Sequence, residues 1–250
     1  MSFVHRKSAK VLVGQYDQSA FFNNADISWE VDTPESTVFG NDDRTYIAGL
    51  RNASMSFSGF WSMTSSNAPD AVVPGQLAAT AATKITFAPE GLSFGNITYA
   101  GQARYTNYSI ANPVDGIVGI TLDTQITGRL SRGYSLHNLT AVTSDGNTGS
   151  HDLAAGSSSG GVAYLHVTAI TLPATCQLIV SVQDCATTDG VWADLTNFTT
   201  ISCSVAMSDR QTVAGNVDRY VRAEWDFTTP SCDIETGTFH VNFQQLPTSG

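Results

Sequence analysis

The sequence predicts an all-β protein, and three observations support this. Charged residues make up only 14% of the chain, while Ser, Thr, Gly, Asn and small apolar residues dominate. This composition is typical of many strands joined by turns. Several stretches alternate apolar and polar residues with the period of two that marks a strand with one packed face. Only residues 76–83 have good helix propensity, and they are expected to form one short helix.

In the first half of the chain, strands are expected at residues 11–13, 25–32, 53–59 and 119–127, with further strands between 84 and 110. Three of them have an unusually uniform polar face. In the 25–32 strand, these polar residues are Asp26, Ser28, Glu30 and Asp32. In the 53–59 strand they are Ser54, Ser56 and Ser58, and in the 119–127 strand they include Asp123, Gln125 and Thr127. Each strand therefore has one packed and one solvated face.

A projecting loop is expected between the first two of these amphipathic strands. Its polar tip, residues 41–45, is bracketed by Phe39-Gly40 and Gly49-Leu50. Glycines and polar residues at such positions favour turns. The unit therefore reads as strand, projecting loop, strand.

The second half begins with a change in composition. Residues 137–161 are rich in Gly, Ser, Asp and Asn, and short strands are expected after them at 162–170, 177–183, 199–207, 217–227 and 238–243. Regular spacing of short strands is typical of a sandwich. We therefore predict two domains, residues 1–135 and an appended β-sandwich, Ig-like or jelly-roll-like, at 136–250.

The net charge of -10 is concentrated in this second half. Residues 1–135 hold 11 acidic and 9 basic residues, whereas 136–250 hold 11 and 3, a balance of -8. Beyond Arg6, Lys7 and Lys10 there is no basic cluster, which argues against tight binding of a nucleic-acid backbone. No apolar run reaches the length of a signal peptide or a membrane span, so neither secretion by that route nor membrane insertion is expected.

No catalytic, cofactor-binding or metal-binding residues are predicted, and the protein is not expected to be an enzyme. Residues 156–160 match G-x-S-x-G, but no amphipathic helix follows them. The five histidines lack metal-binding spacing, and His166 and His240 fall on the polar phase of their strands, which predicts solvated side chains. The spacing of the four cysteines does not fit a zinc site and favours small buried side chains; a disulfide stays open for Cys176, Cys185, Cys203 and Cys232.

Several motifs in the first half resemble those of siphophage major tail (tail tube) proteins. The central ones are Thr37-Val-Phe-Gly, Thr45-Tyr-Ile-Ala-Gly-Leu-Arg-Asn-Ala and Ser56-Phe-Ser-Gly-Phe. Flanking pieces are Val11-Leu-Val, Tyr16-Asp-Gln-Ser-Ala-Phe-Phe-Asn-Asn-Ala-Asp-Ile-Ser, Pro113-Val-Asp-Gly-Ile-Val-Gly-Ile and Gly128-Arg-Leu-Ser-Arg-Gly. The pieces lie in the expected order across residues 1 to about 133, roughly half of the chain.

The resemblance implies a structural virion protein made in the host cytoplasm. Its subunits would polymerise into stacked hexameric rings that form the DNA conduit of a long-tailed phage and contact other tail proteins. Double-stranded DNA would pass without tight binding. The projecting loop would reach a neighbouring subunit through Phe39, Gly40, Asn41, Asp42, Asp43, Arg44, Tyr46, Gly49 and Leu50. We interpret the three uniform polar faces as candidate lining of the conduit, with ordinary solvent-facing strands as the alternative.

Two other functions stay open at this point. The first is a capsid decoration or adhesion protein with a C-terminal glycan-binding sandwich, because residues 219–225 weakly resemble a strand of jelly-roll carbohydrate-binding modules. The second is a glycan-cleaving enzyme, which would need two carboxylates converging on a cleft.

Overall fold

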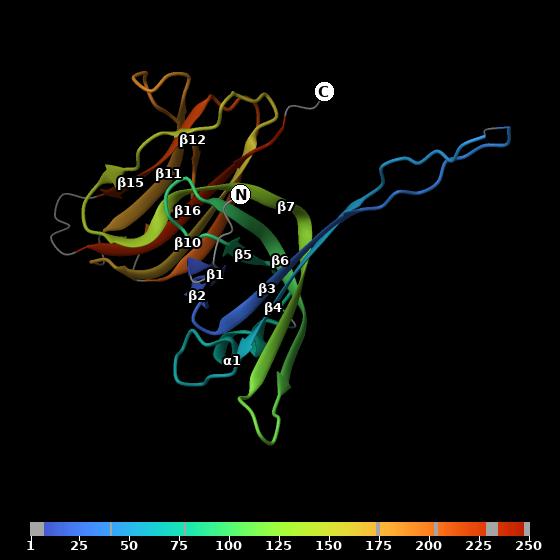
Figure 1. Ribbon diagram of the computed structural model, residues 1–250. Coiled ribbons are helices and arrows are strands. Elements are labelled where there is room, and N and C mark those ends of the chain that lie inside the picture. The colour runs from blue at the N-terminus through green and yellow to red at the C-terminus, as the bar shows by residue number, and fades with distance from the viewer. Residues whose placement is uncertain are drawn as a thin grey trace. The chain divides into compact units, whose positions relative to one another are not determined.

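The computed structural model confirms the all-β prediction, because the regular elements of the described residues are strands apart from one short helix and one 3-10 helix (Figure 1). The structure describes residues 8–40, 42–77, 79–173, 176–202, 205–228 and 235–247. Contacts divide the chain into two compact units. Unit 1 comprises Met1–Ser19, Lys84–Ala100 and Ser131–Gly250, and unit 2 comprises Ala20–Thr83 and Gly101–Leu130.

These units do not follow the boundary near residue 135 that the composition suggests. The strands β6 (Ile97–Ala111) and β7 (Gly119–Val142) each contribute residues to both units. Such long strands pair with segments that are distant in sequence, and a break in local composition does not report that pairing. Independent folding of 1–135 and 136–250 stays a prediction.

Unit 1 contains two antiparallel sheets. The strand order is β14-β10-β16-β7-β6-β5-β1-β2 in one sheet and β12-β11-β15-β8 in the other, where β13 joins β11 and β9 joins β15. The strands of the first sheet, besides β6 and β7, are β1 (Lys10–Val13), β2 (Tyr16–Asp17), β5 (Thr83–Ala88), β10 (Gly161–Thr171), β14 (Met207–Val213) and β16 (Thr236–Gln245). Those of the second are β8 (Gly146–Asn147), β9 (His151–Asp152), β11 (Gln177–Cys185), β12 (Ala193–Asn197), β13 (Ile201–Ser202) and β15 (Tyr220–Thr228).

The core of unit 1 lies between these sheets and consists of side chains that follow the strand period of two. Leu178, Val180 and Val182 of β11 are buried in one cluster with Leu165 of β10 and Phe239 of β16. Burying a side chain of this kind contributes about 1.5–3 kcal/mol. The predicted sandwich architecture therefore has a physical basis in the alternation seen in the sequence.

Unit 2 is built around β3 (Phe22–Val31), β4 (Arg51–Phe60) and the first part of β7. β3 pairs with β4, and β4 pairs with β7, both antiparallel. Met55, Phe57 and Leu122 are completely buried on one face of these strands. Gly59 is required by close approach, because a Cβ there would lie 1.9 Å from the carbonyl oxygen of Phe21.

The short helix lies at a lower residue number than predicted. The structure has α1 at Pro69–Val72 and a 3-10 turn, η2, at Pro74–Gln76. Proline suits the first turn of a helix, since its fixed φ is already helical and its missing N–H is not needed there. In the predicted segment, 76–83, the described residues form only the end of η2, turns and the start of β5, because eight residues are too few to hold a helix by propensity alone.

The prediction of solvated histidines is wrong for His166 and His240, which are both completely buried. Nδ1 of His166 donates to the carbonyl oxygen of Gly14 at 2.6 Å. Nε2 of the same ring lies 2.8 Å from Oγ1 of Thr86. Nδ1 of His240 donates to the carbonyl oxygen of His137 at 2.6 Å. Both faces of β10 and β16 are covered at this point, so the polar phase of these strands does not reach water.

These two histidines should make unit 1 sensitive to acid. Burial lowers the pKa of His166 to about 4 and that of His240 to about 3, from an ordinary value of 6.5. As the pH falls, both histidines take up a proton in the unfolded chain at a higher pH than in the folded chain. The stability that the two neutral rings contribute is therefore fully present above pH 6.5 and is lost as the pH falls toward the pKa values of the folded state. In chemical unfolding experiments between pH 6 and 4.5, each histidine should lower the free energy of unfolding by about 1.4 kcal/mol per pH unit.

A His240→Gln variant isolates this contribution. Its unfolding free energy should depend on pH less steeply than that of the wild type, by about 1.4 kcal/mol per pH unit in the same window. An unchanged slope in a folded variant would show that His240 does not titrate between the two states.

Candidate functional site

The three polar faces predicted from the sequence lie on one continuous face of unit 2. In antiparallel pairs, directly opposed residues project from the same side of the sheet. One row across β3, β4 and β7 consists of Asp26, Ser56 and Asp123, and the next consists of Ser28, Ser54 and Gln125. A third row is Asn24, Ser58 and Thr121. The register therefore brings together side chains separated by about a hundred positions in the chain.

Hydrogen bonds connect the side chains of this polar face. Ser56 Oγ donates to Asp123 Oδ1 at 2.5 Å, and Asn107 of β6 donates to Asp123 Oδ2 at 3.0 Å. Asn24 Nδ2 donates to Asp26 Oδ2 at 2.7 Å. The middle row is thus an ordered polar strip that crosses the strands.

The polar face carries negative charge. Asp26 and Glu30 are exposed, Asp123 is half-buried, and none of the nine residues in the three rows is Lys or Arg. Asp32 lies just beyond β3, where its backbone N–H donates to the carbonyl oxygen of Leu50 at 2.9 Å. Thr127 is exposed on β7. Nine of the ten residues proposed for the conduit lining therefore belong to β3, β4 or β7, and Asp32 directly follows β3.

Sequence reasoning missed several members of this face. Asn24 and Asn52 continue the alternation of their strands, and that phase could have identified them. Gln125 Nε2 donates to Asn52 Oδ1 at 2.6 Å. Asn107 could not be found in this way, because its approach to Asp123 depends on how β6 and β7 meet.

Between β3 and β4, the described residues 32–40 and 42–50 form the two sides of a long hairpin, and we call residues 32–50 the arm. Figure 1 shows it projecting well beyond the ends of the two strands. Its two sides are joined by sparse contacts, including a bridge between Glu35 and Tyr46 and a backbone hydrogen bond of 2.8 Å from Ser36 to Thr45. Arg44 lies 3.9 Å from Glu35 as an exposed ion pair. The predicted projecting loop is therefore present, and it is longer than expected.

The arm exposes an unusual amount of apolar surface. Its exposed large apolar side chains are Val38, Phe39, Tyr46, Ile47 and Leu50, and they continue onto Trp29 and Val31 of β3. Near the tip, Glu35, Thr37, Val38, Phe39 and Gly40 line a hollow of about 540 Å³. Asn41 lies outside the described residues. Neighbouring apolar groups left in water indicate an interaction site more than isolated exposed ones do.

The strand β3 also leaves a backbone edge open. β3 spans ten residues and pairs with β4 along one side, and in the described part of the chain no strand lies along its other side. An open edge of this length presents unpaired N–H and C=O groups that can pair with another chain. The arm, the open edge and the polar face are thus neighbouring features of the same two strands.

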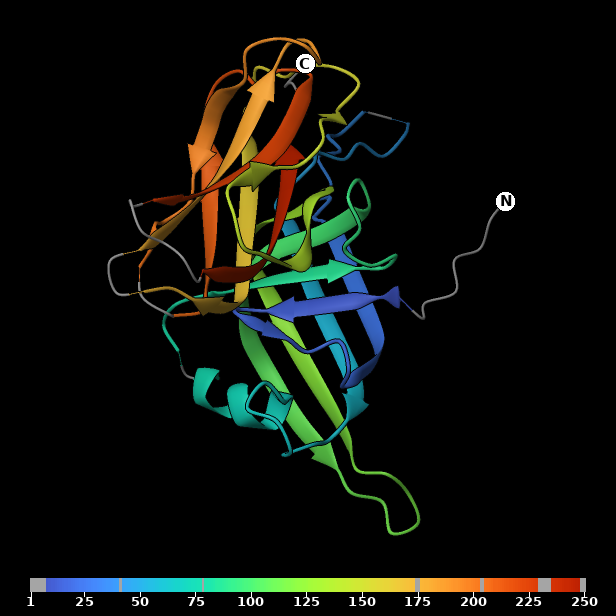
Figure 2. The same cartoon turned by 90° about the vertical axis from the view of Figure 1, so that its left-hand side faces the viewer.

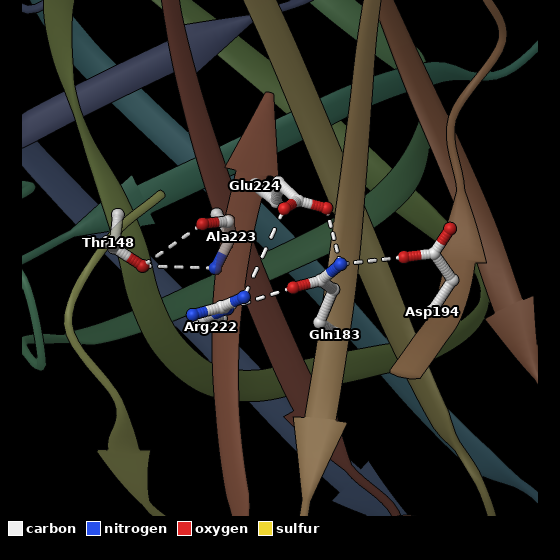
Figure 3. Close-up of polar contacts among 6 residues, drawn as sticks. All are labelled: Thr148, Gln183, Asp194, Arg222, Ala223 and Glu224. Carbon is white, nitrogen blue, oxygen red and sulfur yellow. Dashed lines mark hydrogen bonds and ion pairs between the residues drawn. The ribbon is translucent and has the colours of Figure 1, made fainter. Parts of the chain in front are cut away.

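A second polar cluster occupies the smaller sheet of unit 1 (Figure 3). Gln183 donates through Nε2 to Asp194 at 2.9 Å and also to Glu224, and its Oε1 accepts a 2.8 Å hydrogen bond from Nε of Arg222. The Arg222 guanidinium lies 4.4 Å from the centroid of the Trp192 ring. These groups form hydrogen bonds with one another and lie beside an aromatic ring.

The cysteines differ from one another. Cys176 is disulfide-bonded, whereas Cys185 is a buried free thiol that donates to the carbonyl oxygen of Val191 at 3.2 Å. Cys203 and Cys232 lie outside the described residues. Among the residues described, no group of three or more His, Cys, Asp or Glu side chains could hold a metal ion. The described helices are all too short or too polar to cross a membrane.

Comparison with known proteins finds similarity only among solved structures, since no family model and no curated protein matches the chain. One similar chain comes from a native gene transfer agent virion, with 18% identity over 52% of this chain and 98% of that chain and a TM-score of 0.42. The SPP1 Dit protein, described as a hub of the adsorption apparatus, has 12% identity over 95% of this chain and 99% of its own, with a TM-score of 0.40. The SPP1 tail tube has 12% identity over 51% of this chain and 78% of that chain, with a TM-score of 0.41.

All three TM-scores lie below 0.5, and similarity this weak assigns no function by itself.

Proposed function

We propose that this protein is a structural subunit of a phage tail, specifically a tail-tube subunit that assembles into stacked rings around a DNA conduit. The observation that carries the proposal is the combination, on β3 and β4, of an open strand edge and an apolar arm beside one continuous polar face. The three central sequence motifs that resemble those of major tail proteins lie on the arm and on β4.

The open edge supports lateral assembly. A neighbouring subunit that pairs along β3 would satisfy its exposed backbone groups, and a closed ring of subunits would leave no edge to aggregate. The charged residues of β3 lie on the polar face and leave the pairing direction clear. Ring formation would therefore cover the open edge of β3 that could otherwise aggregate.

The arm supports contact beyond the immediate neighbour. Burying Val38, Phe39 and Leu50, which are exposed in the single chain, would gain free energy only when another molecule covers them. We place Phe39 to Leu50 in an inter-subunit contact for this reason.

The polar face suits a conduit for DNA. Asp26, Glu30 and Asp123 face the same side, so they would repel phosphates over about a Debye length, ~8 Å at physiological salt. A wall without clustered cations avoids the counterion release that would hold DNA in place. Passage without tight binding follows from this arrangement.

An adhesion or capsid decoration role is the second candidate, and the Gln183–Arg222–Glu224 cluster beside Trp192 favours it. A few convergent polar groups next to an aromatic ring are typical of small-ligand sites. The hydroxyls of a glycan could bind such polar groups, and the apolar faces of its sugar rings could pack on the aromatic ring. These polar groups are already paired with one another, which weakens the case for a bound ligand.

Negative-stain electron microscopy of the purified full chain tests the proposal. Self-assembled tubes of constant diameter are expected, and they should appear without any other tail protein as the concentration is raised. Discrete monomers or trimers at every concentration would contradict a tail-tube subunit and would support the adhesion role.

A further inference from the structure

The end of β16 and a neighbouring part of β7 line a hollow of about 280 Å³ in unit 1, which we call the β16 cleft. β16, drawn in red in Figure 2, lies between β7 and β10 in the larger sheet. The volume is close to the lower end of small-molecule sites, about 300–1,000 Å³, and suits a ligand of one ring. The lining includes Arg132, Tyr134, Leu153, Gln244, Leu246 and Pro247.

A close approach of two strands shapes the cleft. Tyr134 of β7 pairs with Phe243 of β16. A Cβ at the adjoining Gly133 would lie 2.3 Å from the carbonyl oxygen of Phe243 and 3.0 Å from Cα of Gln244, so only glycine lets the strands meet here. Gln244 therefore lies tightly against β7 and is only 8% exposed.

Gln244 brings a buried acceptor to the cleft that has no hydrogen-bond partner, its Oε1 atom. The neighbouring Gln245 differs, because its Nε2 donates to the carbonyl oxygen of Ala155 at 3.0 Å. A buried carbonyl oxygen without a partner destabilises a fold, and native structures contain few of them. In a cleft, such an oxygen marks the position at which an O–H or N–H of a ligand would donate.

Tyr134 gives the cleft an aromatic ring that other rings hold in place. The centroid of the His151 imidazole lies 4.2 Å from that of the Tyr134 ring, and Phe94 meets the same imidazole edge-on at 5.9 Å. Neither His151 nor Phe94 lines the cleft itself. Tyr134 and the adjacent Leu153 therefore offer apolar surface on which the C–H face of a ring can pack.

Arg132 gives the cleft a positive charge. Its side chain is exposed, and within the described ranges it takes part in none of the ion pairs. Asp152, next to the lining residue Leu153, is already held by Arg219 through hydrogen bonds of 2.8 and 2.7 Å. The Arg132 guanidinium is thus available to an anion, and a carboxylate matches its planar fork with two parallel hydrogen bonds.

We infer that the β16 cleft binds a sugar that carries a carboxylate, such as the hexuronic acid of an acidic glycan. The carboxylate meets Arg132, a ring hydroxyl donates to Oε1 of Gln244, and the apolar face of the sugar packs on Tyr134. A neutral sugar would leave the cation without its anion, and a small inorganic anion would leave the aromatic ring uncovered. This site is separate from the Gln183–Arg222–Glu224 cluster and does not depend on the tail-tube function.

A peptide C-terminus also combines a carboxylate with an N–H donor, but the backbone of the cleft does not suit it. Chain ends are captured by groups of free backbone N–H donors. Here the N–H of Leu246 already donates to the carbonyl oxygen of Gly160 at 2.8 Å, and Pro247 has no N–H. Recognition therefore falls to side chains, which favours the sugar.

Saturation-transfer NMR on the full-length protein tests the inference, and it works on single chains and on large assemblies alike. The two probes are methyl glucuronide and its neutral counterpart, methyl glucoside. The glucuronide should bind at least about tenfold more tightly at low salt, because only its carboxylate bonds to the guanidinium. The difference should shrink as salt is raised, since Arg132 is exposed and its charge is screened.

Three variants separate the roles of the side chains. Arg132→Gln should bind both probes equally, whereas Arg51→Gln, at an exposed arginine outside the cleft, should keep the preference for the glucuronide. Gln244→Leu should weaken binding of both probes by about tenfold. The same variant should raise the melting temperature by at least about 2 °C, because it removes a buried acceptor that has no partner. A purely structural glutamine would lower it.

Four results would overturn the inference: no binding of the glucuronide, equal binding of the two glycosides by the wild type, a preference retained in Arg132→Gln, or a lower melting temperature in Gln244→Leu. Tighter binding of N-acetyl-alanine than of the glucuronide would assign the cleft to a peptide end instead. Equal binding of acetate would reduce it to a general anion contact. Tubes in electron micrographs enter none of these outcomes, so the tail-tube function stands or fails separately.

Discussion

Phage particles whose tails carry lysine at positions 26, 30 and 123 should assemble normally and eject their genome slowly or not at all. Asp26→Lys, Glu30→Lys and Asp123→Lys replace the carboxylates of the polar face with cations. Each lysine that neutralises a phosphate releases counterions and adds affinity, so DNA should stick to the wall. The delay should be largest at low salt and should shrink as salt is raised, because counterion release weakens with ionic strength.

The measurement is release of DNA from purified particles, followed with a fluorescent intercalating dye over a series of salt concentrations. A matched control places the same three charge changes away from the polar face, as Glu90→Lys, Asp189→Lys and Asp218→Lys on exposed residues of unit 1. Normal ejection from the polar-face variant, or an equal delay in the control, would show that these residues do not line the conduit.

Deleting Asn41 to Arg44 should give a folded subunit that no longer polymerises. The deletion removes the polar end of the arm and shortens the connection that positions Val38 and Phe39 for contact with another copy. The arm contributes little to the packing of unit 2, since its residues are all solvent-exposed where described. The melting temperature should therefore stay within a few degrees of the wild type, while tubes disappear from electron micrographs.

A variant with the same four residues replaced by Gly-Ser-Gly-Ser separates length from side-chain chemistry. Assembly in this variant and not in the deletion would show that the arm needs its reach. Normal tubes from the deletion would mean that the arm tip is only a surface hairpin.

The alternation of residues along the chain determined much of this picture by itself. A period of two in residues 25–32, 53–59 and 119–127 identified three strands and the side chains on their polar faces, because neighbouring side chains of a strand point to opposite faces. Glycines and polar residues around position 41 likewise identified a projecting loop. Local chemistry was sufficient for these features.

Tertiary structure alone decided which of these faces meet and which positions are dry. The rows that join Asp26, Ser56 and Asp123 depend on strand register, which is set by long-range pairing. The polar phase of β10 and β16 predicted water around His166 and His240, yet other strands cover that side and bury both rings. Local pattern reports which face of a strand is polar, whereas only the packing of distant segments determines whether that face meets solvent, a partner or the core.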